Sequence, residues 1–134
     1  MAETGFSRST AALTTKNAPK PNGKYSHIMR SGNHVYLCGF MGDDATTGNI
    51  LHEKTEGQTR QIMRNIQACL EAAGSSLDKI ISRRIYMIDM SEFRIVDRIW
   101  GEWIKEPYPV STCIGVTALA KEGAKVEIEV VAEA

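Results

Sequence analysis

Two glutamates near the C-terminus have the type and spacing of residues that activate water. Glu127 and Glu129 alternate with aliphatic residues in the segment 125–132. Because successive side chains of a strand point to opposite faces, both carboxylates share one face and the aliphatic residues share the other. A glutamate in a partly desolvated site can act as a general base, since desolvation raises its pKa toward neutrality. A solvated strand face fits the same pattern.

Three cysteines are the other side chains able to act as nucleophiles. Cys38 and Cys113 lie in apolar, strand-like segments without a histidine beside them, and Cys69 lies on the apolar side of a helix-like segment. A reactive thiolate needs a nearby base or cation, so buried small hydrophobic residues are the preferred interpretation. Their odd number and the lack of Cys-x-x-Cys spacing indicate neither a disulfide framework nor a zinc site. The three histidines are scattered as well, so no metal site is expected.

The composition fits a single domain over residues 1–134, because 43% hydrophobic residues can fill one core. Sixteen basic residues balance sixteen acidic ones, which argues against nucleic acid as a partner. No apolar run approaches the ~20 residues of a membrane helix and no secretory signal is found, so we expect a cytoplasmic protein without a membrane partner. Residues 2–24 faintly resemble an organelle-targeting segment, which keeps a mitochondrial location open. A flexible start over residues 1–9, followed by an edge strand, is the preferred interpretation.

The first half of the chain predicts a hairpin followed by a helix. Residues 25–30 and 34–40 flank a tight turn at Ser31-Gly32-Asn33 and are typical of paired strands. After a polar loop, Thr55 and Gln58 match a capping box, in which each side chain bonds the backbone at the helix start. Apolar residues then recur at helical spacing up to Gly74, so this helix should pack on the sheet.

The second half predicts a strand, a helix and two further strands. Residues 80–90 favour a strand, and Ser91 is expected to cap a helix whose apolar stripe includes Trp100 and Trp103. The last strands are predicted at about 110–119 and 125–132. The order β-β-β-α-β-α-β-β indicates an α+β fold, a single mixed β-sheet with both helices on one face.

Such a sheet leaves its other face uncovered. Residues that could lie on that face are Tyr36, Cys38, Tyr86, Ile88 and Val116. Because a large exposed apolar face usually marks an assembly surface, we expect a homo-oligomer with ligand clefts between its subunits.

The ordered set of short motifs resembles the Rid/YjgF family of enamine and imine deaminases over roughly residues 10–132. No single motif decides the resemblance, but seven occur in the order that this family shows. They are Asn17-Ala18-Pro19, Gly23-Lys24-Tyr25, Cys38-Gly39, the helix from Gln58 to Gly74, the segment from Asp89 to Phe93, the segment from Pro109 to Cys113, and Val126-Glu127-Ile128-Glu129. The segment 23–32 is most similar to the branch that contains 2-aminomuconate deaminases.

The resemblance implies a chorismate-mutase-like homotrimer that needs no cofactor and binds a small molecule in clefts at its subunit interfaces. It assigns Tyr25 and Glu127 to catalysis, with Glu127 positioning or activating water. Tyr25 either donates a hydrogen bond to a ligand carbonyl or caps the sheet edge. Cys113, Cys38 and Gly39 are implied to lie in the substrate-binding part of the cleft.

Three positions depart from the family pattern that the resemblance implies. Ser111 stands where typical members carry an arginine that holds the substrate carboxylate through a fork of donors. A serine hydroxyl brings no charge, so the affinity for such a carboxylate should fall by about 1.5–3 kcal/mol. Asp97 replaces an asparagine on the second helix, and Cys38 stands where serine is common.

Arg83 and Arg84 interrupt an otherwise apolar strand. Alternation groups Arg84 with Tyr86, and Arg83 with the core-facing Ile85 and Met87. We therefore expect Arg84 to face the cleft and to supply the charge that Ser111 lacks. The alternative is an interface salt bridge from Arg84 to an acidic residue of a neighbouring chain, at position 97, 127 or 129.

The sequence thus predicts a cofactor-free trimeric hydrolase that hydrolyses or tautomerises a small reactive imine or enamine. The substitution at Ser111 indicates a substrate unlike those of typical members. The alternative is a non-catalytic ligand-binding or chaperone-like trimer on the same scaffold. A ribonuclease is disfavoured by the zero net charge and by the lack of a basic patch with interleaved aromatic residues.

Overall fold

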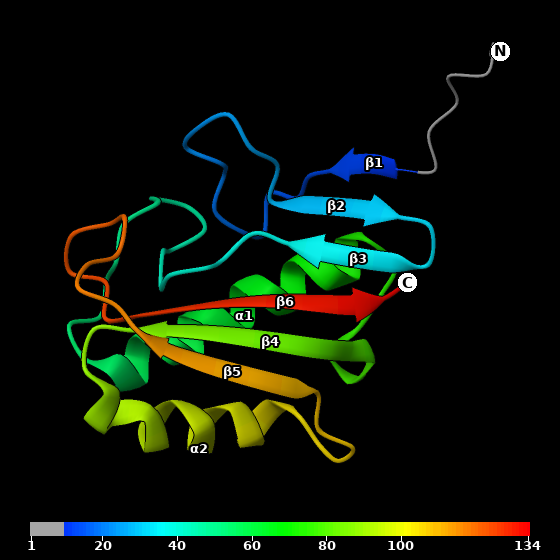
Figure 1. The fold of residues 1–134 in the computed structure, drawn as a ribbon. Coiled ribbons are helices and arrows are strands. Elements are labelled where there is room, and N and C mark those ends of the chain that lie inside the picture. Colours follow the sequence, from blue (N-terminus) through cyan, green and yellow to red (C-terminus); the bar gives the residue numbers. More distant parts are fainter. Residues whose placement is uncertain (1–9) are drawn as a thin grey trace, which may run out of the picture.

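Six strands form one mixed sheet in the computed structural model, which describes residues 10–134 (Figure 1). The strand order is β1-β2-β3-β6-β4-β5; β4 and β5 run parallel, and every other pair is antiparallel. The expected flexibility of residues 1–9 falls outside the described residues. The strands are β1 (Thr10–Leu13), β2 (Ile28–Ser31), β3 (His34–Leu37), β4 (Ile80–Met87), β5 (Val110–Gly115) and β6 (Val126–Glu133).

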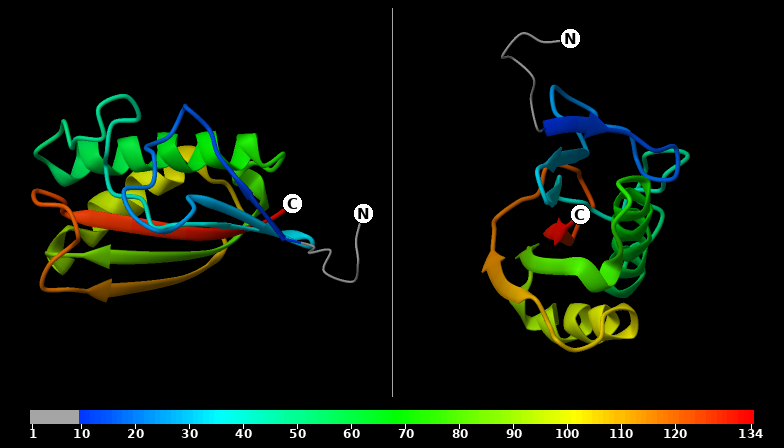
Figure 2. Two further views of the ribbon diagram at one scale, coloured as in Figure 1. Left: turned by 90° about the horizontal axis from the view of Figure 1, so that it is seen from above. Right: turned by 90° about the vertical axis from the view of Figure 1, so that its right-hand side faces the viewer.

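Both α-helices lie on the same face of this sheet, as Figure 2 shows from two sides. They are α1 (Thr55–Ala72) and α2 (Phe93–Trp103), and the short 3-10 turns Leu77–Lys79 and Met90–Glu92 lead into β4 and α2. The aliphatic residues of β6 are buried against the helices, whereas Glu127 and Glu129 between them point to the opposite face. The predicted α+β class, element order and one-sided helix layer are confirmed.

The predicted hairpin is confirmed, but several strands are shorter than expected. β2 and β3 pair in antiparallel register around Gly32, whose φ of 57° lies in the region that favours glycine. β3 ends at Leu37, and Phe40 then forms only an isolated bridge to Ile128 of β6. β4 and β5 also end before residues 90 and 119, because the chain leaves the sheet into the turns that precede α2 and β6.

Both predicted helix caps are wrong: Thr55 bonds a residue distant in sequence, and Asp89 rather than Ser91 is the capping residue of the turn before α2. Lys54 is the N-cap of α1 and makes no side-chain cap bond, while the Thr55 hydroxyl donates to Glu92 Oε1. Ser91 lies inside the 3-10 turn before α2, where its backbone N–H donates to Asp89 Oδ1 at 3.0 Å. The Thr55 side chain therefore joins α1 to the turn before α2, whereas Ser91 takes part in a local bond within that turn.

Gln58 has the most connected of these side chains. It is fully buried, and its amide donates to the backbone carbonyls of His52 at 3.0 Å and Gly123 at 2.9 Å. Its Oε1 accepts from the Lys125 backbone N–H at 2.8 Å. One side chain therefore fastens α1 to the loop before it and to the turn that starts β6.

The face of the sheet opposite the helices carries exposed apolar side chains. Tyr36 is 46% exposed and Ile88 42%, in line with the sequence-based expectation, while Cys38, Tyr86 and Val116 are partly buried. Other exposed apolar residues of this face are Val110 and Ile114 of β5. Within residues 10–134 neither helix covers this face (Figure 2).

We predict that Gln58→Met lowers the free energy of unfolding by about 1–3 kcal/mol, because three backbone groups lose their hydrogen-bond partner. The measurement is urea denaturation at one fixed protein concentration, followed by circular dichroism. Gln67→Met, a partly buried position on the same helix, is the matched control and should change little. Equal effects of the two substitutions would contradict the role assigned to Gln58.

Candidate active site

The residues beside Ser111 centre on a buried arginine of β4. Arg83 pairs with Ser111 across the parallel strands β4 and β5, and it is 8% exposed. Its Nε donates to Ser111 Oγ at 2.7 Å, and its Nη2 donates to Asp97 Oδ1 of α2 at 2.6 Å. Two of the three departures from the family pattern, Ser111 and Asp97, thus bind the same guanidinium.

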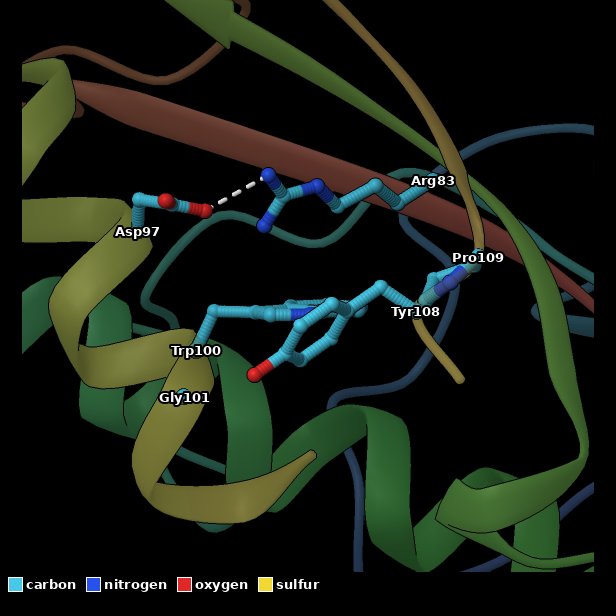
Figure 3. A pocket seen from close by; sticks show the side chains of 6 residues that line it. All are labelled: Arg83, Asp97, Trp100, Gly101, Tyr108 and Pro109. Atoms are coloured by element: carbon cyan, nitrogen blue, oxygen red, sulfur yellow. Dashed lines mark hydrogen bonds and ion pairs between the residues drawn. The ribbon is translucent and has the colours of Figure 1, made fainter. Parts of the chain in front are cut away.

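The guanidinium also lies over an aromatic ring at the wall of a cavity. Its central carbon is 4.8 Å from the centroid of the Trp100 ring, a distance typical of cation–π contact. Arg83 Nη1 is buried and has no hydrogen-bond partner among the described residues. A cavity of about 280 Å³ adjoins this group; it is lined by Arg83, Asp97, Trp100, Gly101, Tyr108 and Pro109 (Figure 3).

Glu127 lies against the end of β3 on the helix-free face. A Cβ at Gly39 would be 2.8 Å from Glu127 Cδ, so only glycine lets this carboxyl lie so close to the backbone. Burial raises the pKa of Glu127 above its ordinary value, and the nearby charges of Glu129 and Asp43 raise it further. A carboxylate with a raised pKa can accept a proton from water more readily, as a general base must.

Glu129, the second glutamate of this face, has a partner within the chain. The Tyr86 hydroxyl of β4 donates to Glu129 Oε1, and this hydrogen bond raises the pKa of Tyr86. No such hydrogen bond to the Glu127 carboxylate is found among residues 10–134. The two carboxylates of the strand therefore differ, with Glu129 tied to a neighbour and Glu127 left for another group.

The three thiols lie in surroundings that disfavour the thiolate. Burial raises the pKa of Cys38 to about 12, with a further contribution from the Glu127 charge, and burial raises that of Cys69 to about 12. Burial also raises the pKa of Cys113, although Arg83 partly opposes the shift. Cys113 Sγ contacts Met90 Sδ at 3.8 Å. These contacts support the interpretation of the cysteines as packing residues rather than nucleophiles.

Arg83, Ser111, Asp97 and Trp100 form what we call the Arg83 cluster. Tyr25 and Arg84 lie away from this cluster of their own chain. The Tyr25 hydroxyl donates to Asn22 Oδ1 at 2.8 Å, and the side chain is 49% exposed. Arg84 lies on the helix-free face opposite Glu129 in the register, as the alternation indicated. The charge beside Ser111 within one chain is therefore that of Arg83, while Arg84 lies on the face that would meet another subunit.

The candidate residues form two groups on opposite faces of the sheet. Ser111 shares the helix-side face with Arg83, whereas Glu127 shares the helix-free face with Tyr86. Cys38 and Gly39 belong with Glu127, and Asp97 and Cys113 belong with Ser111. A single chain does not bring the proposed water-activating carboxylate to Ser111.

Sequence reasoning missed Arg83, although one signal was present. Alternation placed this charged residue on the core-facing side with Ile85 and Met87, where a charge needs a partner. A search for that partner on the neighbouring elements would have led to Asp97.

Residues 10–134 contain no cluster of three or more histidine, cysteine or acidic side chains arranged to hold a metal ion. Within the same described part of the chain, neither helix combines the length and the apolar character that crossing a membrane requires.

We predict that Glu127→Gln raises the stability of the protein at neutral pH. The folded-state pKa is raised, so ionisation disfavours the folded protein as the pH climbs above the ordinary value of 4.5 and through the folded value. The stability gained by the variant should therefore grow from acidic to neutral pH, as measured by thermal unfolding. Glu122→Gln, at an exposed turn, is the control. A stability gain of Glu127→Gln that does not change with pH would contradict the raised pKa of Glu127.

Comparisons with known proteins agree with this fold and with these motifs. The family model described as Endoribonuclease L-PSP matches residues 15–134. A RutC family protein of Pyrococcus horikoshii is 38% identical over 120 residues, which cover 90% of this chain and 94% of that protein. A 2-iminobutanoate/2-iminopropanoate deaminase of Dermatophagoides farinae is 30% identical, with 87% of this chain and 91% of that protein covered.

Among solved structures, a protein of unknown function from Yersinia pestis, described as a member of the conserved Rid protein family, superimposes with a TM-score of 0.89. It is 33% identical and covers 93% of this chain and 99% of its own. The resemblance inferred from the motifs is thereby confirmed. The chain belongs to the Endoribonuclease L-PSP family, which includes the Rid proteins.

Proposed function

We propose that this protein is a cofactor-free hydrolase that deaminates or tautomerises a small imine or enamine in clefts between its subunits. Support at the family level comes from relatives named as deaminases. The observation that carries the proposal is the position of Glu127, which is partly buried, has a raised pKa and lies against Gly39. We further propose one domain over residues 1–134 and a cytoplasmic location.

The cleft requires a second copy of the chain, since Ser111 and Glu127 lie on opposite faces of one sheet. β5, which carries Ser111, is the edge strand, so a neighbouring chain can lie beside it. The exposed apolar side chains of the helix-free face give that neighbour a surface to bury. A homotrimer would place Glu127 of one subunit near Ser111 of the next.

In this arrangement Glu127 accepts a proton from a water molecule as the water oxygen bonds to the imine carbon, and that proton then passes to the nitrogen. The C–N bond of the resulting carbinolamine breaks, so that ammonia leaves and a carbonyl group forms. Ser111 and Tyr25 hydrogen-bond the polar end of the substrate, and the backbone near Cys113 and Gly39 completes the cleft. Arg84 and the paired Glu129 lie on the face that would meet the neighbouring subunit. No cofactor is required, since hydrolysis of an imine needs only acid–base chemistry and a positioned water.

Glu127→Gln should lower the rate of imine hydrolysis by at least about 100-fold, the scale of one general base. Ammonia release is measured with freshly generated 2-aminoacrylate, with its uncharged amide 2-aminoacrylamide and, separately, with 2-aminomuconate. Glu122→Gln is the matched control and should retain the wild-type rate. If the wild-type protein accelerates none of these reactions, the deaminase proposal fails and the non-catalytic ligand-binding alternative is favoured.

The proposed trimer predicts that Tyr36→Asp lowers the mass measured by sedimentation from that of three chains to that of one. In the trimer, a carboxylate at position 36 would lie in the interface formed by the helix-free faces of the sheets, where it would lose its hydration without gaining a partner. The control is Leu51→Asp, which changes an apolar side chain that is 61% exposed on a loop outside the sheet. A wild-type protein that sediments as a single chain at micromolar concentration would contradict the proposal.

A further inference from the structure

The Arg83 cluster bears on which chemical group this protein can recognise. A guanidinium binds a carboxylate most specifically with two parallel N–H donors, one of which is often Nε and the other an Nη. In this protein Ser111 Oγ accepts from Nε and Asp97 Oδ1 accepts from Nη2. The chain's own oxygen atoms therefore occupy the fork formed by Nε and Nη2, and a ligand carboxylate that approached Nη1 and Nη2 instead would lie next to Asp97.

Charge reinforces this geometry. Asp97 already neutralises Arg83 through an ion pair of 2.6 Å, and its side chain is 50% exposed beside the cavity. A second carboxylate bound to Arg83 would either displace Asp97 or lie close to it, and like charges at that distance repel each other. Ser111 adds only a hydroxyl and no compensating positive charge.

One nitrogen of the guanidinium, Nη1, is still without an acceptor among the described residues. This nitrogen is buried, and the whole Arg83 side chain is only 9% exposed. Buried donors are nearly always paired, so an unpaired one at the wall of a cavity calls for an acceptor from a ligand or a water molecule. The adjoining cavity of about 280 Å³ is lined by Trp100, Tyr108 and Pro109, which suit a small flat molecule (Figure 3).

We propose that this cavity binds the oxygen of a neutral carbonyl group, such as an amide, ester or ketone, through Arg83 Nη1 and discriminates against a free carboxylate. The inference rests on the proposed function, because it names the substrate class of the same cleft. The substrate is then an imine or enamine that carries an uncharged carbonyl group instead of an α-carboxylate. Asp97 is the residue that determines this specificity, since its carboxylate binds Arg83 Nη2 and repels a second carboxylate.

Pyruvamide and pyruvate are suitable probes, because they have the same carbon skeleton and differ in the charge of one group. Their binding to the intact protein is measured by NMR titration, with the Trp100 indole N–H and the Arg83 Nε–H as reporters. Because no turnover is measured, the outcome is independent of whether the protein is a deaminase. The wild-type protein should bind pyruvamide at least about tenfold more tightly than pyruvate, the scale of one charged hydrogen bond.

Asp97→Asn, which changes a single atom and keeps the shape, should shift this preference toward pyruvate by at least about tenfold. Arg83→Met should abolish binding of both probes. If this variant does not fold, Arg83→Lys, which keeps the positive charge, replaces it and should weaken binding of both probes. Arg98→Met is the matched control: Arg98 lies on the same helix as Asp97, its exposed guanidinium pairs with Glu56 of α1, and its loss should leave both affinities unchanged. Binding of neither probe, equal or tighter binding of pyruvate by the wild type, or an unchanged preference in Asp97→Asn would overturn the proposal.

Discussion

The ion pair between Arg83 and Asp97 is the interaction on which the helix-side half of the site depends. It connects β4 to α2, and the Nε–H of the same arginine connects β4 to Ser111 on the edge strand β5. A buried guanidinium is tolerated only with such partners, because an unpaired buried charge is strongly unfavourable. Trp100 completes its surroundings by placing an aromatic ring against the cation. Any ligand that enters the adjacent cavity therefore meets a charge that is already balanced.

The second constraint is the sheet itself, which separates the candidate residues by face. Alternation along β6 directs Glu127 away from the helices, and the parallel register of β4 and β5 directs Ser111 toward them. The same separation gives Glu127 its chemical character, because the end of β3 and Gly39 bury it while Glu129 and Asp43 add negative charge nearby. A site that uses both faces needs more than one chain, and this requirement links the proposed catalysis to the proposed assembly.

Periodicity in the sequence was sufficient to predict the fold, but polar side chains were predicted poorly. The apolar stripe of each helix and the alternation along β6 have one dominant cause, burial against the sheet, and this cause is written in neighbouring residues. Thr55, Gln58 and Ser91 also matched local capping rules, yet Glu92, the β5–β6 turn and Asp89 are their actual partners. A hydrogen-bonding side chain takes the best available partner, and here the better ones are mostly distant in sequence.

The sequence by itself determined the α+β class, the order of elements, the family and the shared face of Glu127 and Glu129, because each of these follows from local patterns or ordered motifs. It also placed Arg83 and Arg84 on opposite faces. Only the tertiary structure decided that Arg83 supplies the guanidinium beside Ser111, and that Ser111 and Asp97 accept hydrogen bonds from its Nε and Nη2. The physical reason is that these contacts join residues 14 and 28 positions apart on three different elements, whose relative placement is fixed by packing. No regular spacing of residues along the chain predicts contacts between positions so far apart in sequence.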